Sequence, residues 1–431
     1  MEWLRKLELM CRWSTKAVSE IIKEKMKEKN STPQCCLCGL TQSQLTDQLI
    51  KGVDGYVCRG CVEKCHDIYE DLIKQKPSED EVVQFKVPSA PEIKNFLDQY
   101  VIGQERAKKV LSVAVHSHYS RIMSDKNSPM SDVELDKSNV LLIGPTGTGK
   151  TFLAQTVARM LDVPCAISDA TTLTEAGYVG ADPENILLKL YQASGNNIQK
   201  TERGIVVLDE IDKKSKKSDG VSITRDVSGE GVQSALLKII EGCESDVPLT
   251  GGRKHPMAET VRINTKNILF VLCGDFIGLD KIVANRQKDK GSIGFVNNLE
   301  CGKGLDKVSP EDLIAFGMIP ELVGRIPVVS SLNLLSESDL VRILSEPKNA
   351  VLRQYQKLAM IEGATIDFEE KAKKEIAHIA FVRNTGARGL RAVVEEVLLD
   401  IMYDIKAGDK VNITKQMVID LTNGTKDENV A

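Results

Sequence analysis

One segment limits the possible folds of this chain more than any other. It fits the pattern G-x4-G-K-[ST] and consists of Gly144, Pro145, Thr146, Gly147, Thr148, Gly149, Lys150 and Thr151. The apolar run 140–143 precedes it, and the helical pattern 152–161 follows it. A glycine-rich turn between a buried strand and a helix presents backbone N–H groups to a phosphate. The segment therefore predicts an α/β domain that binds the phosphates of a nucleotide.

A pair of acids supplies the second half of this chemistry. The apolar run 205–208 ends in Asp209 and Glu210. We expect Lys150 to place its charge near the β- and γ-phosphates, and the Thr151 hydroxyl to ligate Mg²⁺. Asp209 would hold the Mg²⁺ shell, and Glu210 would polarise the attacking water. Paired acids at a strand end are also compatible with a helix N-cap, but the preceding phosphate loop favours ATP hydrolysis.

Short apolar runs alternate with helical patterns from residue 92 onward, which predicts a parallel sheet within an α/β domain. The expected strands are 140–143, 205–208 and 268–272. Later the pattern changes to long helices at 337–360, 369–382 and 389–407, with a brief strand at 364–368. The predicted organisation is an extension of unknown role (1–30), a metal module (31–72), a linker (73–91), a large ATPase domain (92–326) and a smaller, mainly helical domain (327–431).

The cysteines indicate a metal site rather than disulfides. Six of the eleven lie between Cys35 and Cys65, and the total is odd. Two C-x2-C pairs, separated by 19 residues, consist of Cys35, Cys38, Cys58 and Cys61. Four thiolates at this spacing close a tetrahedral Zn²⁺ shell, so we expect a structural zinc site. We assign no ligand role to Cys36 or Cys65, and His66 is expected at the surface.

Charge and composition exclude several other classes of protein. Lys and Arg number 57 against 61 Asp and Glu, so the net charge of -4 argues against non-specific binding of nucleic acid by the whole protein. We find no apolar stretch long enough to cross a membrane and no secretory signal. The expected location is the cytoplasm, without membrane or nucleic-acid partners.

Two arginines lie in segments that attract attention once the phosphate loop is in place. Arg325 occurs in IPELVGR, at the expected junction of the two domains, and Arg388 occurs in NTGARGLR, at the start of a helix. Hydrolysis needs positive charge near the departing γ-phosphate. A lone arginine is more often part of a surface ion pair, so the residue type alone does not decide its role.

Together, the phosphate loop, the acidic pair, GYVG, IPELVGR and GARGLR resemble the AAA+ ATPases of the Clp family. The four-cysteine module makes the chain similar to the ClpX-type unfoldases, which work with the ClpP peptidase. The resemblance covers about 33–420 and implies an AAA+ P-loop NTPase large domain, a helical small domain and a homohexamer that uses ATP, Mg²⁺ and Zn²⁺. It implies an ATP-dependent unfoldase that feeds tagged substrates, with possible adaptors, to a separate peptidase.

The resemblance also implies roles for individual residues. Val101 and Ile102 would contact adenine, Arg325 would reach a neighbour's nucleotide, and Arg388 would act as a sensor within its own subunit. Tyr178 and Val179 match an aromatic pore loop, and 222–232 resembles a second one. Further matches are an entrance loop (Arg253, Lys254, His255) and a peptidase-docking tripeptide (Ile293, Gly294, Phe295). Asp275 departs from the family pattern, which has small residues there.

Two other classes of function remain as alternatives. One is an AAA+ machine that acts on nucleic acid, such as a helicase or clamp loader; the zinc module's mixed charge and few aromatic residues, Tyr56 and Tyr69, weaken it. The other is a scaffold that does not hydrolyse ATP, which the intact Lys150, Asp209 and Glu210 oppose. The chain contains no G-x-S-x-G or H-E-x-x-H pattern, so we expect no peptidase activity of its own.

Overall fold

The computed structural model covers the whole chain, and it describes residues 33–45, 47–51, 55–75, 87–124, 133, 135–174, 181–216, 229–249, 259–289 and 307–427. The chain divides into two units, Met1–Lys86 and Val87–Ala431. The long helix α2 of the first unit ends at Gln75, and helix α3 of the second begins at Ala90, so both extend slightly into the segment expected as a linker.

The first unit is small and has almost no apolar core. Its elements are η1 (Gln42–Gln44), β1 (Ile50–Lys51), β2 (Tyr56–Val57) and α2 (Arg59–Gln75). Strands β1 and β2 pair in antiparallel fashion, with Ile50 opposite Val57. Among the described residues of this unit, Cys35 and Cys58 are the only buried ones. So few buried side chains do not stabilise a fold by themselves, and this agrees with a metal as the centre of the unit.

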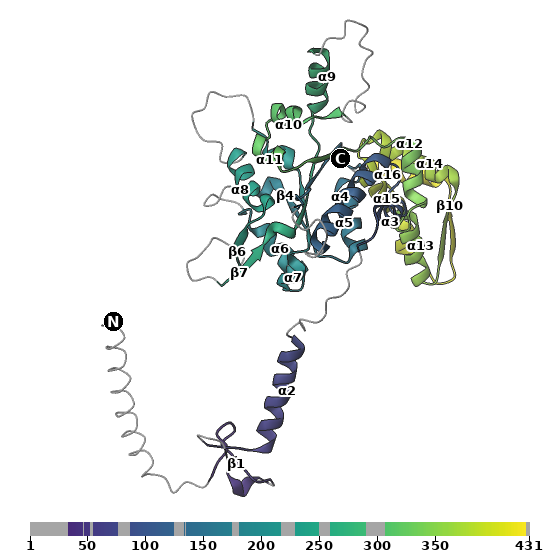
Figure 1. The fold of residues 1–431 in the computed structure, drawn as a ribbon. Helices are drawn as coiled ribbons and strands as arrows, with labels where there is room; N and C mark the ends of the chain where they lie inside the picture. The colour runs from purple at the N-terminus through teal and green to yellow at the C-terminus, as the bar shows by residue number, and fades with distance from the viewer. Residues whose placement is uncertain are drawn as a thin grey trace. The chain divides into compact units, whose positions relative to one another are not determined.

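A five-stranded parallel sheet organises the second unit, as the apolar runs predict (Figure 1). The strands are β3 (Val140–Ile143), β4 (Cys165–Asp169), β5 (Ile205–Asp209), β8 (Leu269–Gly274) and β9 (Val328–Ser331), in the order β4-β5-β8-β3-β9. Strands β3 and β8 are buried along their whole length. Because the strands are parallel, the segments that follow β3, β5 and β8 meet at one edge of the sheet.

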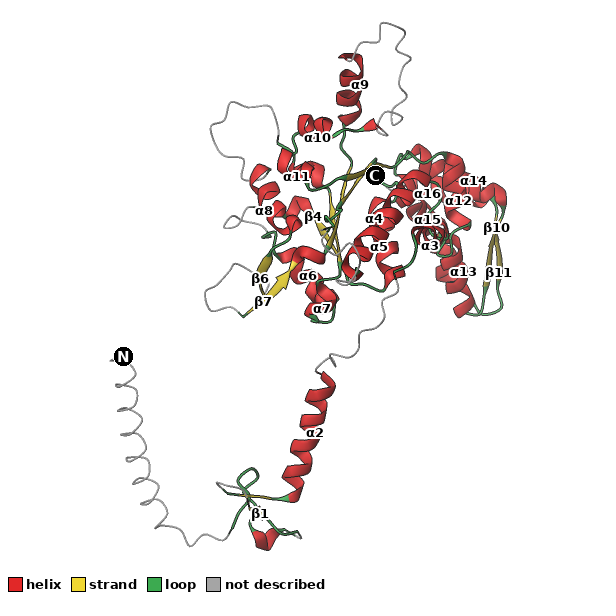
Figure 2. Cartoon of the chain, in the orientation of Figure 1, coloured by secondary structure: helices red, strands yellow, loops and turns green. Residues whose placement is uncertain are grey.

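Helices pack on both faces of this sheet, with α4 and α5 on one face and α6 on the other (Figure 2). The large domain contains α3 (Ala90–Asp98), α4 (Glu105–Met123), α5 (Lys150–Leu161), α6 (Asn185–Ala193), α7 (Ile198–Thr201), α8 (Glu230–Glu241), α9 (Leu279–Asp289), α10 (Pro310–Phe316) and α11 (Pro320–Gly324). It also contains η2 (Ala170–Thr172), η3 (Ile211–Lys214), η4 (Thr265–Asn267) and the hairpin β6 (Glu244–Pro248) and β7 (Thr260–Asn264). Within the described parts of the chain, no helix combines the length and apolarity needed to cross a membrane.

The C-terminal domain is mainly helical, as predicted. Its elements are α12 (Glu337–Ser345), α13 (Val351–Ile361), β10 (Thr365–Phe368), α14 (Glu370–Val382), α15 (Gly386–Asp404), β11 (Lys410–Ile413) and α16 (Lys415–Asp427). Its own buried core includes Leu344, Ile376 and Val394. Strands β10 and β11 form a small parallel pair.

Two details of this region differ from the sequence prediction. The single helix expected at 337–360 is two helices, α12 and α13, because Pro347 has no N–H and its ring clashes with the carbonyl of the preceding turn. Strand β9 lies after the domain boundary expected at 326/327 but belongs to the large sheet, where Val328 pairs with Val140. A short strand of mixed polarity, Val-Val-Ser-Ser, gives little sign in sequence of which domain it joins.

Candidate functional site

The phosphate loop leaves the buried strand β3 and enters α5 at Lys150. Gly147 and Gly149 have φ values of +80° and +97°, which residues with a Cβ rarely adopt. The Thr148 hydroxyl donates a hydrogen bond to the carbonyl oxygen of Pro145 at 2.8 Å. The glycines of the motif therefore set the path of the loop, and the start of α5 is free to offer its N–H groups to an anion.

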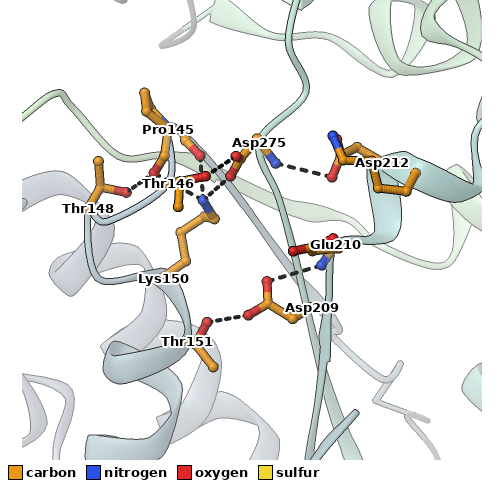
Figure 3. Close-up of polar contacts among 11 residues, drawn as sticks. Pro145, Thr146, Thr148, Lys150, Thr151, Asp209, Glu210, Asp212 and Asp275 are labelled. Carbon is orange, nitrogen blue, oxygen red and sulfur yellow. Dashed lines mark hydrogen bonds and ion pairs between the residues drawn. The ribbon is translucent and has the colours of Figure 1, made fainter. Parts of the chain in front are cut away.

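The side chain of Lys150 is buried at the base of this loop (Figure 3). Its amine donates to the carbonyl oxygens of Gly144 at 2.5 Å and Pro145 at 3.1 Å. It also forms an ion pair with Asp275, which follows strand β8, at 2.5 Å. Burial raises the pKa of the Asp275 carboxyl, but hydrogen bonds from Lys150 and Thr146 outweigh it and hold that pKa below its usual range.

Thr151 and the acidic pair meet at the same edge of the sheet. The Thr151 hydroxyl donates to a carboxylate oxygen of Asp209 at 2.6 Å, and the backbone N–H of Glu210 donates to the other at 3.0 Å (Figure 3). Mg²⁺ prefers hard oxygen ligands of this kind, so the donor set fits that ion. Glu210 has a left-handed backbone, with φ of +56°, and its side chain is exposed. This left-handed conformation is not that of a strand, so the strand ends before Glu210 and the residue lies outside the sheet.

A cavity of about 530 Å³, here called the P-loop cleft, lies between the large and small domains. Its volume is within the range of small-molecule sites. It is lined by Tyr100, Thr146, Gly147, Gly149, Lys150, Thr151, Phe152, Gln155, Asp209, Glu210, Asp275, Ile343, Pro347, Asn349, Val351, Gln354, Ala387, Arg388 and Arg391. Residues of the phosphate loop and the acidic pair thus share one cleft with residues of the C-terminal domain.

The start of helix α15 contacts the phosphate loop directly. The N–H of Ala387 donates to the carbonyl oxygen of Gly147 at 3.1 Å, and Gly386 packs against Gly147. Arg388, one residue further on, is exposed and lines the P-loop cleft. Its side chain forms no hydrogen bond or ion pair with any residue that the structure describes. An arginine in this position is available to an anionic ligand in the cleft of its own chain.

Arg325 lies elsewhere. It caps the C-terminus of α11, is exposed, and pairs with Glu241 at 2.9 Å. Its side chain is not part of the P-loop cleft. The structure therefore brings Arg388, but not Arg325, to the phosphate loop of the same chain. Exposed ion pairs contribute little to stability, so the Arg325–Glu241 pair is easily exchanged for another partner.

The segment expected to contact adenine is held in place by polar contacts of a buried lysine. Lys108, which is 2% exposed, pairs with Asp98 and Glu105 and donates to the carbonyl oxygen of Val101 at 3.3 Å. Val101 and Ile102 are themselves buried. Neither belongs to the lining of the P-loop cleft, whereas the adjacent Tyr100 does. Their predicted contact with a base stays a prediction.

The four predicted cysteines of the first unit come together. The sulfur atoms of Cys35, Cys38, Cys58 and Cys61 lie within 4.8 Å of one another, and those of Cys38 and Cys58 are 3.6 Å apart. Four thiolates at about 2.3 Å from one Zn²⁺ would stand roughly 3.8 Å apart, so the donor set and its spacing fit zinc.

Hydrogen bonds within the four-cysteine cluster shift the pKa values of its thiols. The backbone N–H of Cys38 is the main cause that lowers the pKa of Cys35 to about 6, and it outweighs burial. Hydrogen bonds between the Cys61 thiol and the sulfurs of Cys38 and Cys58 raise the pKa of Cys61 to about 12, and burial adds to this rise. Cys36 and Cys65 are exposed and stand outside the cluster. A divalent cation would offset the negative charges that four neighbouring thiolates bring together.

Several predicted residues lie outside the described parts of the chain. They are Tyr178 and Val179 of the first pore loop, most of the second loop at 222–232, Arg253, Lys254 and His255 of the entrance loop, and Ile293, Gly294 and Phe295 of the docking tripeptide. The extension at residues 1–30 also lies outside them.

The sequence prediction overlooked some residues of the cleft. Tyr100 and Arg391 line it beside the predicted residues, as do Asn349, which precedes α13, and Gln354, which lies in the first turn of α13. Their residue types carry no pattern of their own. Two signals in the sequence could have indicated them. Tyr100 lies next to the segment expected to contact adenine, and Arg391 lies about one helical turn after Arg388.

Comparison with known protein families agrees with this geometry. The AAA domain (Cdc48 subfamily) matches residues 135–329. The C-terminal, D2-small domain, of ClpB protein matches residues 335–419. The ClpX C4-type zinc finger matches residues 33–71. The three matches follow one another without overlap, and they correspond to the sheet domain, the helical domain and the four-cysteine unit.

Proposed function

This chain is a ClpX-like AAA+ unfoldase, and on that basis we propose that it couples ATP hydrolysis to the threading of tagged proteins into a ClpP-type peptidase. The observation that carries the proposal is the P-loop cleft, where Lys150 and Asp209 of the large domain face Arg388 of the small domain. A ligand bound there contacts both domains at once. Its hydrolysis therefore changes how the two domains are held together.

Each residue at the edge of the sheet has a defined task in hydrolysis. Lys150 and the loop N–H groups bind the β- and γ-phosphates. Thr151 and Asp209 would hold Mg²⁺, which would neutralise charge on the phosphates. Glu210 accepts a hydrogen bond from the attacking water and orients it towards the γ-phosphate. Glu210 is exposed and lines the cleft, which is suited to a water-handling role.

The two arginines act on opposite sides of a subunit boundary. Arg388 stabilises negative charge on the γ-phosphate in its own chain, because it lines that chain's cleft. Arg325 lies outside this cleft and is exposed, so we assign it to the nucleotide of a neighbouring subunit. A site completed in this way requires a ring, and the proposed form is a homohexamer.

Residues at the axis of that ring grip the substrate. We assign this role to Tyr178 and Val179, whose aromatic and apolar side chains contact any polypeptide without reading its sequence. Gly177 and Gly180 flank them in the sequence, and glycine accepts backbone conformations that other residues rarely adopt. The proposed entrance loop carries three basic or titratable residues that favour some substrate tails, namely Arg253, Lys254 and His255.

Peptide-bond cleavage belongs to the partner in this proposal. Ile293 and Phe295 flank Gly294 and are suited to insertion into apolar pockets of a ClpP-type peptidase. The long polar segment around them is typical of a functional loop. Adaptors and substrate tags then decide which proteins reach the entrance.

The test combines unfolding and partner capture. The wild-type chain should unfold a fluorescent protein with an unstructured tail when ATP and Mg²⁺ are present, and it should co-purify with a ClpP-type peptidase. Tyr178→Ala should abolish unfolding while nucleotide still binds, and Phe295→Ala should lose the peptidase while unfolding continues. If the chain hydrolyses ATP in response to single-stranded DNA but not to unfolded protein, the proposal is wrong.

A further inference from the structure

The amine of Lys150 has no N–H group left for a phosphate. A lysine ammonium has three donors. They are directed at the carbonyl oxygens of Gly144 and Pro145 and at a carboxylate oxygen of Asp275 (Figure 3). Only the last of these acceptors carries a charge. A phosphate that contacts Lys150 must therefore replace one of these partners. Because the phosphate is an anion, it takes the place of the anionic partner, the Asp275 carboxylate.

Asp275 is held in this position by further contacts. The Thr146 hydroxyl donates to its second carboxylate oxygen, and its own N–H donates to Asp212 at 3.2 Å. The carboxylate is 24% exposed and the Lys150 side chain 7% exposed, so the pair is partly shielded from water. Pairs in such surroundings are costly to break, because each charge then needs a new partner.

The position of Asp275 follows from the sheet. Strands β3 and β8 are neighbours, Ile143 pairs with Gly274, and the N–H of Gly144 donates to the carbonyl oxygen of Gly274 at 3.2 Å. The residue after β8 therefore lies beside the phosphate loop that follows β3. Asp275 lines the P-loop cleft and adds a third carboxylate to those of Asp209 and Glu210.

We propose that Asp275 is a specificity-determining residue of the nucleotide site, which competes with the phosphates for Lys150 and so selects magnesium-bound over metal-free nucleotide. This inference rests on the proposed nucleotide function of the cleft. When a phosphate takes Lys150, Asp275 loses its cation and faces an anion across the cleft. Metal-free nucleotide brings only negative charge to this carboxylate, whereas Mg²⁺ on the phosphates offsets much of it.

Equilibrium binding of the fluorescent nucleotide N-methylanthraniloyl-ADP tests the inference, with either Mg²⁺ or EDTA present. The variants are Asp275→Ala, which removes the carboxylate, and Asp275→Asn, which keeps its size without its charge. We expect each to tighten binding in EDTA about tenfold or more, and binding in Mg²⁺ by a much smaller factor. The control is Asp246→Asn, which makes the same charge change in an exposed ion pair with Arg262 on the β6–β7 hairpin. This control should leave the dissociation constants measured in Mg²⁺ and in EDTA unchanged.

Other results separate the possible errors. If the Asp275 variants weaken binding in Mg²⁺, the carboxylate supports the metal and the inference is overturned. Unchanged constants in both buffers, for variants whose thermal unfolding shows that they are folded, also overturn it while the nucleotide site stands. If the wild type and Lys150→Ala are equally unable to bind the probe, the proposed nucleotide function itself fails. Should the alanine variant not fold, the asparagine variant decides alone.

Discussion

Gly147 in the phosphate loop and Gly386 at the start of α15 are in backbone contact, so that a Cβ atom on Gly386 would lie 3.1 Å from the Cα of Gly147. Gly386 has a φ of +58°. Two glycines thus let the small domain approach the phosphate loop closely enough for Arg388 to line the P-loop cleft. Larger residues at either position would separate the two domains at the point where the nucleotide is proposed to join them.

This contact predicts the effect of Gly386→Ala. A Cβ atom there meets backbone atoms that cannot yield cheaply, so the variant should weaken nucleotide binding by about tenfold through displacement of α15. Gly195→Ala is the matched control, because Gly195 has a φ of +69° and open space around its Cβ position. Both variants should lose about 1 kcal/mol of stability from backbone strain, measured by urea unfolding. Equal nucleotide affinities for the two variants would contradict the role of the contact.

The zinc unit gives a second prediction. Cys58→Ser removes a ligand that is buried in the four-cysteine cluster, so zinc content per chain should fall to near zero and the first unit should unfold. Cys36→Ser, at an exposed cysteine outside the cluster, should retain zinc. Metal analysis and proton release on zinc addition are the measurements. Zinc affinity should decrease as pH falls, because protons compete for the thiolates.

Nucleotide binding should survive the loss of zinc. All the described residues that line the P-loop cleft belong to the second unit, Val87–Ala431. Cys58→Ser should therefore bind nucleotide with wild-type affinity. A large loss of affinity would mean that the zinc unit contributes to the cleft.

A structural feature of this protein can be predicted from the sequence when it depends on residues that are close together in the chain, and is missed when it depends on residues far apart. Local signals were sufficient for the strand at 140–143, which the structure confirms residue for residue, and for the four cysteines. The break between α12 and α13 was missed, although Pro347 marks it, because the apolar period continues on both sides. The sequence singled out Asp275 as unusual but did not pair it with Lys150. That pairing requires knowledge that β8 lies next to β3, which neither residue reveals.

A buried histidine predicts sensitivity to acid. His118 on α4 is 1% exposed and donates from Nε2 to the carbonyl oxygen of Asn267 at 3.0 Å. Burial, together with the charge of Arg121, lowers its pKa to about 3. Between that value and the ordinary value of 6.5 the unfolded chain binds the extra proton, so stability falls as pH decreases through 6.5.

The expected loss from pH 7 to pH 5 is about 2 kcal/mol for the second unit. Urea unfolding at both pH values measures it. His118→Gln keeps a donor for Asn267 but cannot take up a proton in this range, so its stability should depend less on pH by about that amount. An identical acid-induced loss in the variant and the wild type would show that other groups are responsible.

The assignment of Arg325 to a neighbouring subunit makes the sharpest prediction about assembly. The Arg325→Ala variant alone should hydrolyse ATP more slowly than the wild type by a factor of about 10³ or more, because a positive charge beside the γ-phosphate is then missing in the transition state. Lys150→Ala alone should be inactive because it does not hold nucleotide. Mixed rings of the two should recover part of the activity, since an Arg325→Ala subunit with an intact cleft then receives the arginine of a Lys150→Ala neighbour. Glu241→Gln, which only releases Arg325 from its exposed ion pair, is the control and should remain active. If mixing restores nothing although the subunits assemble, Arg325 does not act across the boundary, and its pair with Glu241 is its whole role.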